Sequence, residues 1–240
     1  KQIIAEKMTT LETIINSMPL LLIGAVTTLK VTVVSSIIGF SIGILFGCLN
    51  SEKIKTYGFQ NFINFYILIV RGTPVSVQVL IFYYMIPDII GINFSAFAAG
   101  SIALGINSIA YVSEIVRGGI NAIPNGQWEA GYTLGYSKTE KLLYIILPQM
   151  FKNCTPSFTN EFISLIKETS IISIIGLTEL TRVGMNINAR TLQPIPIYLF
   201  EYLSNEYELF VPYDLLAILL DLLLHSTYGL CQLRDSQVLG

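Results

Sequence analysis

The chain has 240 residues, of which 52% are apolar and 12% charged, and its net charge is −2. A soluble domain is about a quarter charged, so this chain has too few charges to cover a water-exposed surface, and without a basic excess we expect no nucleic-acid partner. Its cysteines (Cys48, Cys154, Cys231) are scattered and His225 is its single histidine, so we predict no metal site and no cofactor.

Long uncharged stretches predict several membrane-spanning helices. Between Glu12 and Glu52 the only charged residue is Lys30, and no charge occurs between Asp88 and Glu114. About 20 apolar residues in a helix cross a hydrocarbon core of ~30 Å. We therefore predict an all-α integral membrane protein with about five spans.

The chain begins with a mixed polar segment over residues 1–17, and the first predicted span covers roughly 20–48. Within this span Gly39, Gly43 and Gly47 repeat every four residues. Such a ladder of small residues lies on one helix face, where it lets a neighbouring helix backbone approach closely.

The second predicted span covers roughly 62–86 and is interrupted at residues 71–74. There Thr73 can act as the N-cap and Pro74 as the first residue of a new helix, so we predict that one helix stops and another starts. The third span is predicted over roughly 95–118.

The fourth predicted span, roughly 156–178, contains Glu161, Lys167 and Glu168. Ionisable residues within a membrane are usually paired or face a bundle interior. These three therefore either line a polar pathway or form a buried ion pair. A fifth span is predicted within 197–231.

Basic residues in the short loops predict the orientation. They occur in 50–61 and in 114–155, whereas the loop near 86–94 has none. By the positive-inside rule, 50–61 and 119–155 are cytoplasmic and the N-terminus is outside. Arg182 and Arg190 argue in the opposite direction, more weakly.

The segment 119–155 has the pattern of two helices joined by a tight corner. Residues 127–134 can form a short helix that ends at Gly135, and Ser137 with Glu140 forms a capping box for a second helix, which runs to Pro148. The segment is either a knob for a soluble partner or a self-packed interfacial loop. Glu114 and Arg117, just before it, form either a local surface pair or a support for it.

The same segment resembles the EAA loop of ATP-binding-cassette (ABC) importer permeases, whose pattern is Glu-Ala-Ala, three residues, Gly, nine residues, Ile-x-Leu-Pro. The matching positions are Glu129, Ala130, Gly131, Gly135, Ile145, Leu147 and Pro148. The one departure is Gly131 in place of alanine, which costs a helix up to ~1 kcal/mol but keeps the residue small.

Other stretches are similar to the polar amino acid branch of that family, the histidine, glutamine, arginine and glutamate permeases, and the likeness covers roughly residues 15–200. They are Arg71-Gly72-Thr73-Pro74 with Gln78, then Asn107, residues 110–119, 123–130 and Lys167-Glu168-Thr169-Ser170.

The resemblance implies a non-enzymatic transmembrane permease subunit that moves polar amino acids into the cytoplasm. It would sit as a multi-pass protein in the lipid bilayer of the bacterial inner membrane. Its partners would be separate ATPase subunits, a second permease chain in a homo- or heterodimer, and an extracytoplasmic amino-acid-binding protein. The chain itself has no Gly-x-x-x-x-Gly-Lys-Ser/Thr phosphate-binding loop, which agrees with ATP hydrolysis by another chain.

This interpretation gives a permease domain over 18–200 with the EAA loop at 119–155, followed by a divergent segment over 201–240. That segment places Asp214 and Asp221 in an apolar run, where charges are costly. The alternative is an ion-driven carrier or passive channel for small polar solutes. It would need no docking loop, and the sequence shows no inverted repeat of the kind that such carriers often have.

Overall fold

The computed structural model describes residues 2–54 and 58–192, and the regular structure in this part is entirely helical, as predicted. In chain order the elements are α1 (Gln2–Leu49), α2 (Phe59–Gly72), α3 (Val75–Leu80), a π-helical turn (Ile81–Met85), α4 (Ile86–Ile90), α5 (Ala96–Asn121), α6 (Asn125–Thr133), α7 (Lys138–Lys141), a second π-helical turn (Leu142–Ile146), α8 (Leu147–Glu168), a 3-10 helix (Thr169–Ile175) and α9 (Leu180–Thr191).

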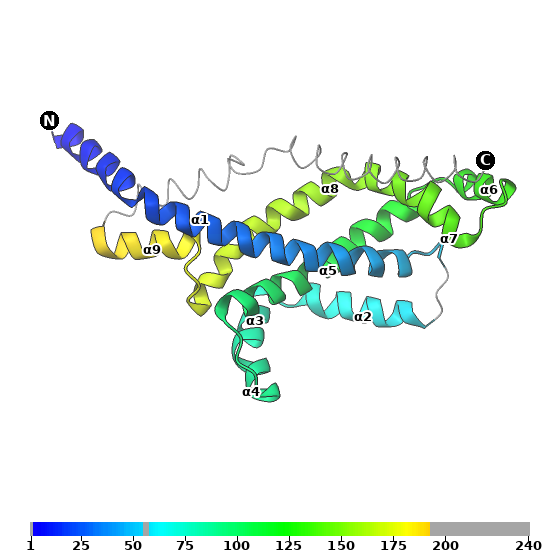
Figure 1. Ribbon diagram of the computed structural model, residues 1–240, viewed down its shortest axis with the longest axis horizontal. Helices are drawn as coiled ribbons and strands as arrows, with labels where there is room; N and C mark the ends of the chain where they lie inside the picture. Colours follow the sequence, from blue (N-terminus) through cyan, green and yellow to red (C-terminus); the bar gives the residue numbers. More distant parts are fainter. Residues whose placement is uncertain (1, 55–57, 193–240) are drawn as a thin grey trace, which may run out of the picture.

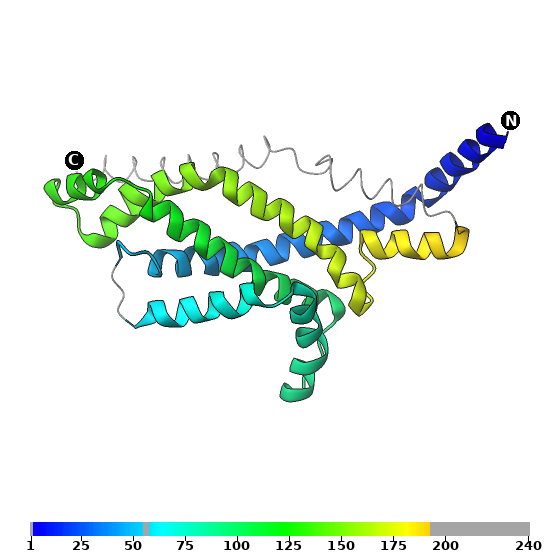
Figure 2. The same ribbon diagram turned by 180° about the vertical axis from the view of Figure 1, so that it is seen from behind.

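The long helices α1, α2, α5 and α8 run along the length of the molecule, and α5 is central because it packs against α1, α2, α3 and α8 (Figures 1 and 2). α9 lies at the end that contains the N-terminus, whereas α6 and α7 lie at the opposite end (Figure 1). The segment 119–155, which contains α6 and α7, therefore lies at one end of the bundle.

The glycine ladder brings α1 and α5 into close contact, as predicted. A β-carbon added at Gly39, Gly43 or Gly47 would lie 2.5–2.7 Å from side-chain atoms of α5. The α5 residues that these β-carbons would contact follow the same four-residue spacing as the glycines: Ser108, Val112 and Val116. Real β-carbons do not approach this closely, so glycine is required at each step of this interface.

The interruption of the second span is a sharp bend, since the axes of α2 and of the α3–α4 segment differ by 101°. The predicted capping is displaced by one residue. Pro74 is the N-cap of α3, and Thr73 is the C-cap of α2 with its hydroxyl donating to the Ile69 carbonyl (3.0 Å). Thr73 precedes a proline and is therefore held in an extended conformation, which ends α2.

The fourth helix differs from its predicted range of 156–178. α7, the π-helical turn and α8 follow one another without a break, so the second helix of the loop does not stop at Pro148 but continues to Glu168. Pro148 is tolerated because it lies in the first turn of α8, directly after the π-helical turn. Pro87 stands in the same relation to the other π-helical turn.

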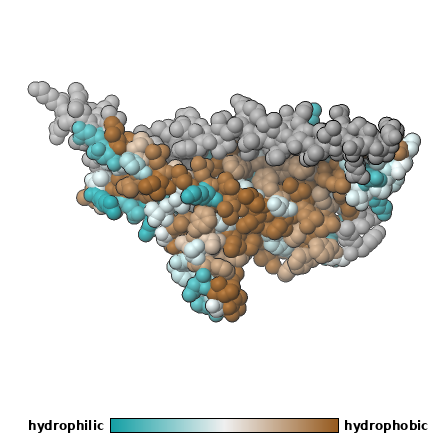
Figure 3. All heavy atoms as spheres, in the orientation of Figure 1, coloured by the Kyte–Doolittle hydropathy of each residue, from teal (hydrophilic) through white to brown (hydrophobic). Residues whose placement is uncertain are grey.

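Within residues 2–54 and 58–192, two helical stretches are long and apolar enough to cross a membrane, Glu12–Leu49 and Ala96–Asn121, and the bent pair Phe59–Gly72 with Val75–Ile90 makes a third if it counts as one span. These stretches correspond to the first three predicted spans. The predicted fifth span lies outside the described residues. Apolar residues cover much of the middle of the visible face, with hydrophilic residues gathered near α9 and near α6 (Figure 3).

Candidate functional site

The corner of the EAA-like loop (residues 119–155) is built by the backbone around Gly135. α6 ends at Thr133 with Leu134 as its C-cap, and Gly135 adopts the left-handed conformation (φ 78°) that the sequence predicts. Its N–H donates to the Tyr132 carbonyl (3.0 Å), and the N–H of Tyr136 donates to the Gly131 carbonyl (3.1 Å). These two bonds form a Schellman motif, which satisfies the last carbonyls of the helix.

The second half of the corner is the predicted capping box. The Glu140 N–H donates to the Ser137 hydroxyl (3.3 Å), and the Ser137 N–H donates to the Glu140 carboxylate (2.8 Å). One helix is thus terminated and the next initiated by hydrogen bonds within a few residues, which makes the corner locally determined.

The inner side of the loop is anchored in the bundle core. Ile123 and Ile146 belong to a buried cluster with residues of α1, α5 and α8, and Trp128 of α6 packs against it. Gln149 of α8 donates to Gln127 of α6 (3.1 Å). The inner side of α6 is therefore in contact with the core between the long helices.

Two of the predicted coupling residues, Glu129 and Ala130, are exposed on α6, and Gly135 is exposed at its end. Leu147 and Pro148 are half-buried at the start of α8. Gly131 lies elsewhere: it is buried against Lys141 and Ile145, so its small size serves contact within the loop rather than an outer surface.

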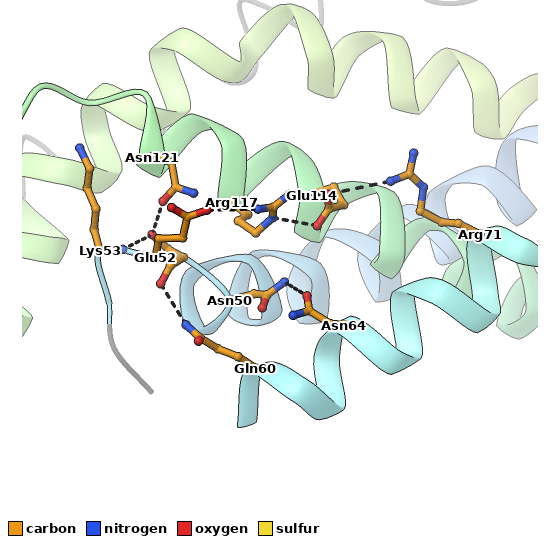
Figure 4. A network of polar contacts seen from close by, with 10 residues as sticks. Asn50, Glu52, Lys53, Gln60, Asn64, Arg71, Glu114, Arg117 and Asn121 are labelled. Atoms are coloured by element: carbon orange, nitrogen blue, oxygen red, sulfur yellow. Dashed lines mark hydrogen bonds and ion pairs between the residues drawn. The ribbon is translucent and has the colours of Figure 1, made fainter. Parts of the chain in front are cut away.

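Glu114 and Arg117 form the predicted ion pair, with nitrogen–oxygen distances of 2.9 and 2.8 Å (Figure 4). The pair is not isolated. Glu114 also lies 3.9 Å from Arg71 of α2, and Arg117 lies 3.9 Å from Glu52, just after α1. The four charges alternate in sign and join α2, α5 and the residues just after α1, so Glu114 and Arg117 belong to a wider network.

Sequence reasoning missed a second set of contacts at the base of the loop. The Lys53 ammonium donates to the Ile123 carbonyl. The Ser51 hydroxyl donates to Asn121 (2.8 Å), which is labelled in Figure 4. These bonds hold the segment after α1 against the start of the EAA-like loop. The available signal was Lys53 itself, one of the basic residues in 50–61 on which the predicted orientation rests.

Two polar side-chain pairs lie deeper, one between α3 and α5 and one between α5 and α8. The Gln78 amide donates to the Val70 carbonyl (2.8 Å) and accepts from Asn107 (3.3 Å). The next residue of α5, Ser108, donates to the Glu161 carboxylate (2.7 Å). Of the three predicted ionisable residues, Glu161 is thus the one directed at α5.

Lys167 and Glu168 are the last two residues of α8, which is followed directly by the 3-10 helix Thr169–Ile175. Lys167 is exposed and Glu168 half-buried. Among the ion pairs of the described residues none involves either side chain.

Comparisons with known proteins are consistent with this arrangement. Residues 55–232 match the family described as binding-protein-dependent transport system inner membrane component, so the match continues past Phe200, where the resemblance read from the sequence ends. The arginine transport system permease protein ArtQ of Bacillus subtilis (strain 168) is 42% identical over 189 residues, which cover 76% of this chain and 84% of that protein. The putative glutamine transport system permease protein GlnP of Rickettsia conorii is 45% identical over 168 residues, 70% of this chain and 76% of that protein.

A solved structure described as an amino acid ABC transporter with histidines superposes with a TM-score of 0.72 at 34% identity, covering 89% of this chain and 96% of that chain. The MetNI methionine ABC transporter in an inward-facing conformation shares the fold, with a TM-score of 0.70 at 19% identity and coverage of 87% and 96%. The chain therefore belongs to the binding-protein-dependent transport system inner membrane component family and is the permease subunit of an ABC importer, with ATP hydrolysis carried out by a separate chain.

Proposed function

We propose that this permease moves polar amino acids into the cytoplasm and that α6, together with the corner at Gly135, is the surface on which an ATPase subunit docks. The cargo class is supported by the relatives named for arginine and glutamine. The proposed assembly contains two ATPase subunits, a second permease chain as homo- or heterodimer, and an extracytoplasmic amino-acid-binding protein. Its location is the bacterial inner membrane, with 119–155 and 50–61 in the cytoplasm.

The observation that carries the docking proposal is the combination of an exposed face and a buried anchor on one short helix. Glu129 and Ala130 are exposed on α6, while Trp128 packs against the core cluster that joins α1, α5 and α8. A movement of the docked ATPase would act on α6 and reach the long helices through Trp128 and Ile123. The hydrogen bonds of the corner at Gly135 stabilise the C-terminal end of α6, so α6 would move as a unit and would not unwind.

The experiment compares two substitutions at Gly135. The position has φ 78° and open space around it, so a new side chain meets no neighbour and only the backbone is strained. Valine tolerates that conformation poorly, at a cost of about 1–3 kcal/mol, whereas asparagine adopts it readily. We expect Gly135→Val to lower ATPase affinity about tenfold and Gly135→Asn to keep it. Wild-type affinity and hydrolysis in the valine variant would reject the docking assignment.

For the solute path we propose Glu161, with Lys167 and Glu168 nearer the end of α8. The proposal is supported by the half-buried carboxylate of Glu161, which accepts from Ser108 beside the buried Gln78–Asn107 pair. A half-buried carboxylate that a hydroxyl group already holds in place is suited to pair with an amino or guanidinium group.

Two variants test the path. Glu161→Gln keeps an acceptor for Ser108 but removes the charge, and we expect normal assembly with at least about a tenfold loss of cationic amino acid uptake. The double variant Lys167→Met with Glu168→Gln should likewise assemble normally yet lose uptake. Unchanged uptake kinetics in both variants would show that the three residues are only structural.

A further inference from the structure

Lys141 is an unusual residue because it is a lysine with almost no exposure. Its exposed fraction is 1%, and it is among the largest fully buried side chains of the described residues. Lysine is almost never fully buried unless its charge is paired. Within the described part of the chain, the Lys141 ammonium has no hydrogen-bond partner, and it lies over the ring of Tyr132.

The stem of Lys141 occupies the space beside Gly131. A β-carbon added at Gly131 would lie 2.6 Å from Cγ and 2.7 Å from Cδ of Lys141, and 3.0 Å from Cδ1 of Ile145. Cγ is close to the backbone of a buried side chain, so it cannot swing away as an exposed lysine tip could. The alanine of the EAA pattern therefore does not fit at position 131 while Lys141 is present.

We propose that Lys141 is a positioning residue of the EAA-like loop. Its stem fills the space beside Gly131 and thereby sets the separation between α6 and the helix formed by α7 and α8. The inference rests on the proposed docking role of α6 and adds the residue that fixes its pose.

The test asks whether Gly131→Ala weakens or strengthens ATPase binding, first with Lys141 present and then with Lys141 replaced by alanine. Helix propensity alone favours alanine over glycine, so Gly131→Ala should improve α6 if nothing stands in the way. With Lys141 present, we expect Gly131→Ala to weaken ATPase affinity about tenfold, since residues in direct contact are strongly coupled. In a Lys141→Ala background the same change should instead improve affinity, and the double variant should come within about threefold of wild type.

Lys141→Met provides a second background because it keeps the unbranched stem and lacks the ammonium. Gly131→Ala must remain harmful there if the stem is the positioning element. The readouts are ATPase affinity in the reconstituted complex and the number of amino acids taken up per ATP hydrolysed. Uptake per ATP should follow the pose of α6, whereas a purely structural effect would change only the amount of folded permease.

Additive effects of Gly131→Ala and Lys141→Ala, or unchanged affinity of Gly131→Ala in the wild-type background, would overturn the proposal. The two Gly135 variants distinguish a failure of the Lys141 proposal from a failure of the docking proposal. If Gly135→Val weakens affinity while the Gly131 and Lys141 effects are additive, only the role of Lys141 is rejected. If Gly135→Val has wild-type affinity, the docking assignment itself fails.

Discussion

Gly43 offers a quantitative test of the contact between α1 and α5. In Gly43→Ala the new β-carbon would lie 2.7 Å from Cβ of Val112, 2.8 Å from its Cγ1 and 3.1 Å from the Ile109 carbonyl oxygen. Carbon atoms pack best at ~3.5–4.0 Å, so the helices must separate by roughly 0.8 Å or more. The Ile109 oxygen belongs to the backbone and cannot rotate away. Overpacking of this kind costs about 1–3 kcal/mol.

Gly118→Ala is the matched control, since Gly118 also lies in a helix but a β-carbon there meets no atom within 4 Å. That substitution should stabilise its helix by up to ~1 kcal/mol. Both variants replace glycine by alanine, and their stabilities should differ by about 1–4 kcal/mol, or roughly 2–16 °C in the thermal midpoint of the purified permease. Equal midpoints would refute the conclusion that the glycine ladder is required by the close approach of α5.

Three further predictions concern topology, the bend and α9. The topology test places single cysteines at Thr139 and Asn93, both exposed positions, in a protein whose Cys231 is replaced by serine. In intact cells the cysteine at Thr139 should be protected from an impermeant thiol reagent and the one at Asn93 should react. The reverse labelling would overturn the orientation. Gln78→Leu should destabilise the permease by about 1–3 kcal/mol because the Val70 and Thr73 carbonyls lose their amide donor. Asn107→Ala removes one longer bond and should cost less. Equal free energies of unfolding for the two variants would contradict this ranking. Glu179, which is 1% exposed, accepts hydrogen bonds from the N–H groups of Thr181 and Arg182 at the start of α9. Glu179→Ala should therefore lower the free energy of unfolding by about 0.5–2 kcal/mol and speed amide hydrogen exchange at both residues. Unaltered exchange would rule out this capping role.

The features that could be predicted from the sequence are those set by neighbouring residues. The spacing of Gly39, Gly43 and Gly47 predicts a close helix contact, and Ser137 with Glu140 predicts the capping box, because both depend on local geometry. Gly135 is predictable for the same reason. The EAA-like loop could therefore be recognised as two capped helices before any tertiary contact was known.

Features that depend on distant contacts could not be predicted. Pro148 resembles a helix stop, but the π-helical turn before it lets the helix continue, and this displaced the predicted span and with it Lys167 and Glu168. α1 begins at Gln2 because residues 1–18 contain neither glycine nor proline, although their polarity favoured a separate segment. The burial of Lys141 depends on Gly131 and Tyr132 folding over it, for which composition gives no signal.

The bend between α2 and α3 is held by hydrogen bonds of two different ranges. The amide NH₂ of Gln78 donates to Val70 and Thr73, eight and five residues before it, so these bonds depend only on the local chain. The Gln78 oxygen accepts from Asn107, which follows 29 residues later. The bend is thus closed within its own residues, and one longer bond joins it to α5.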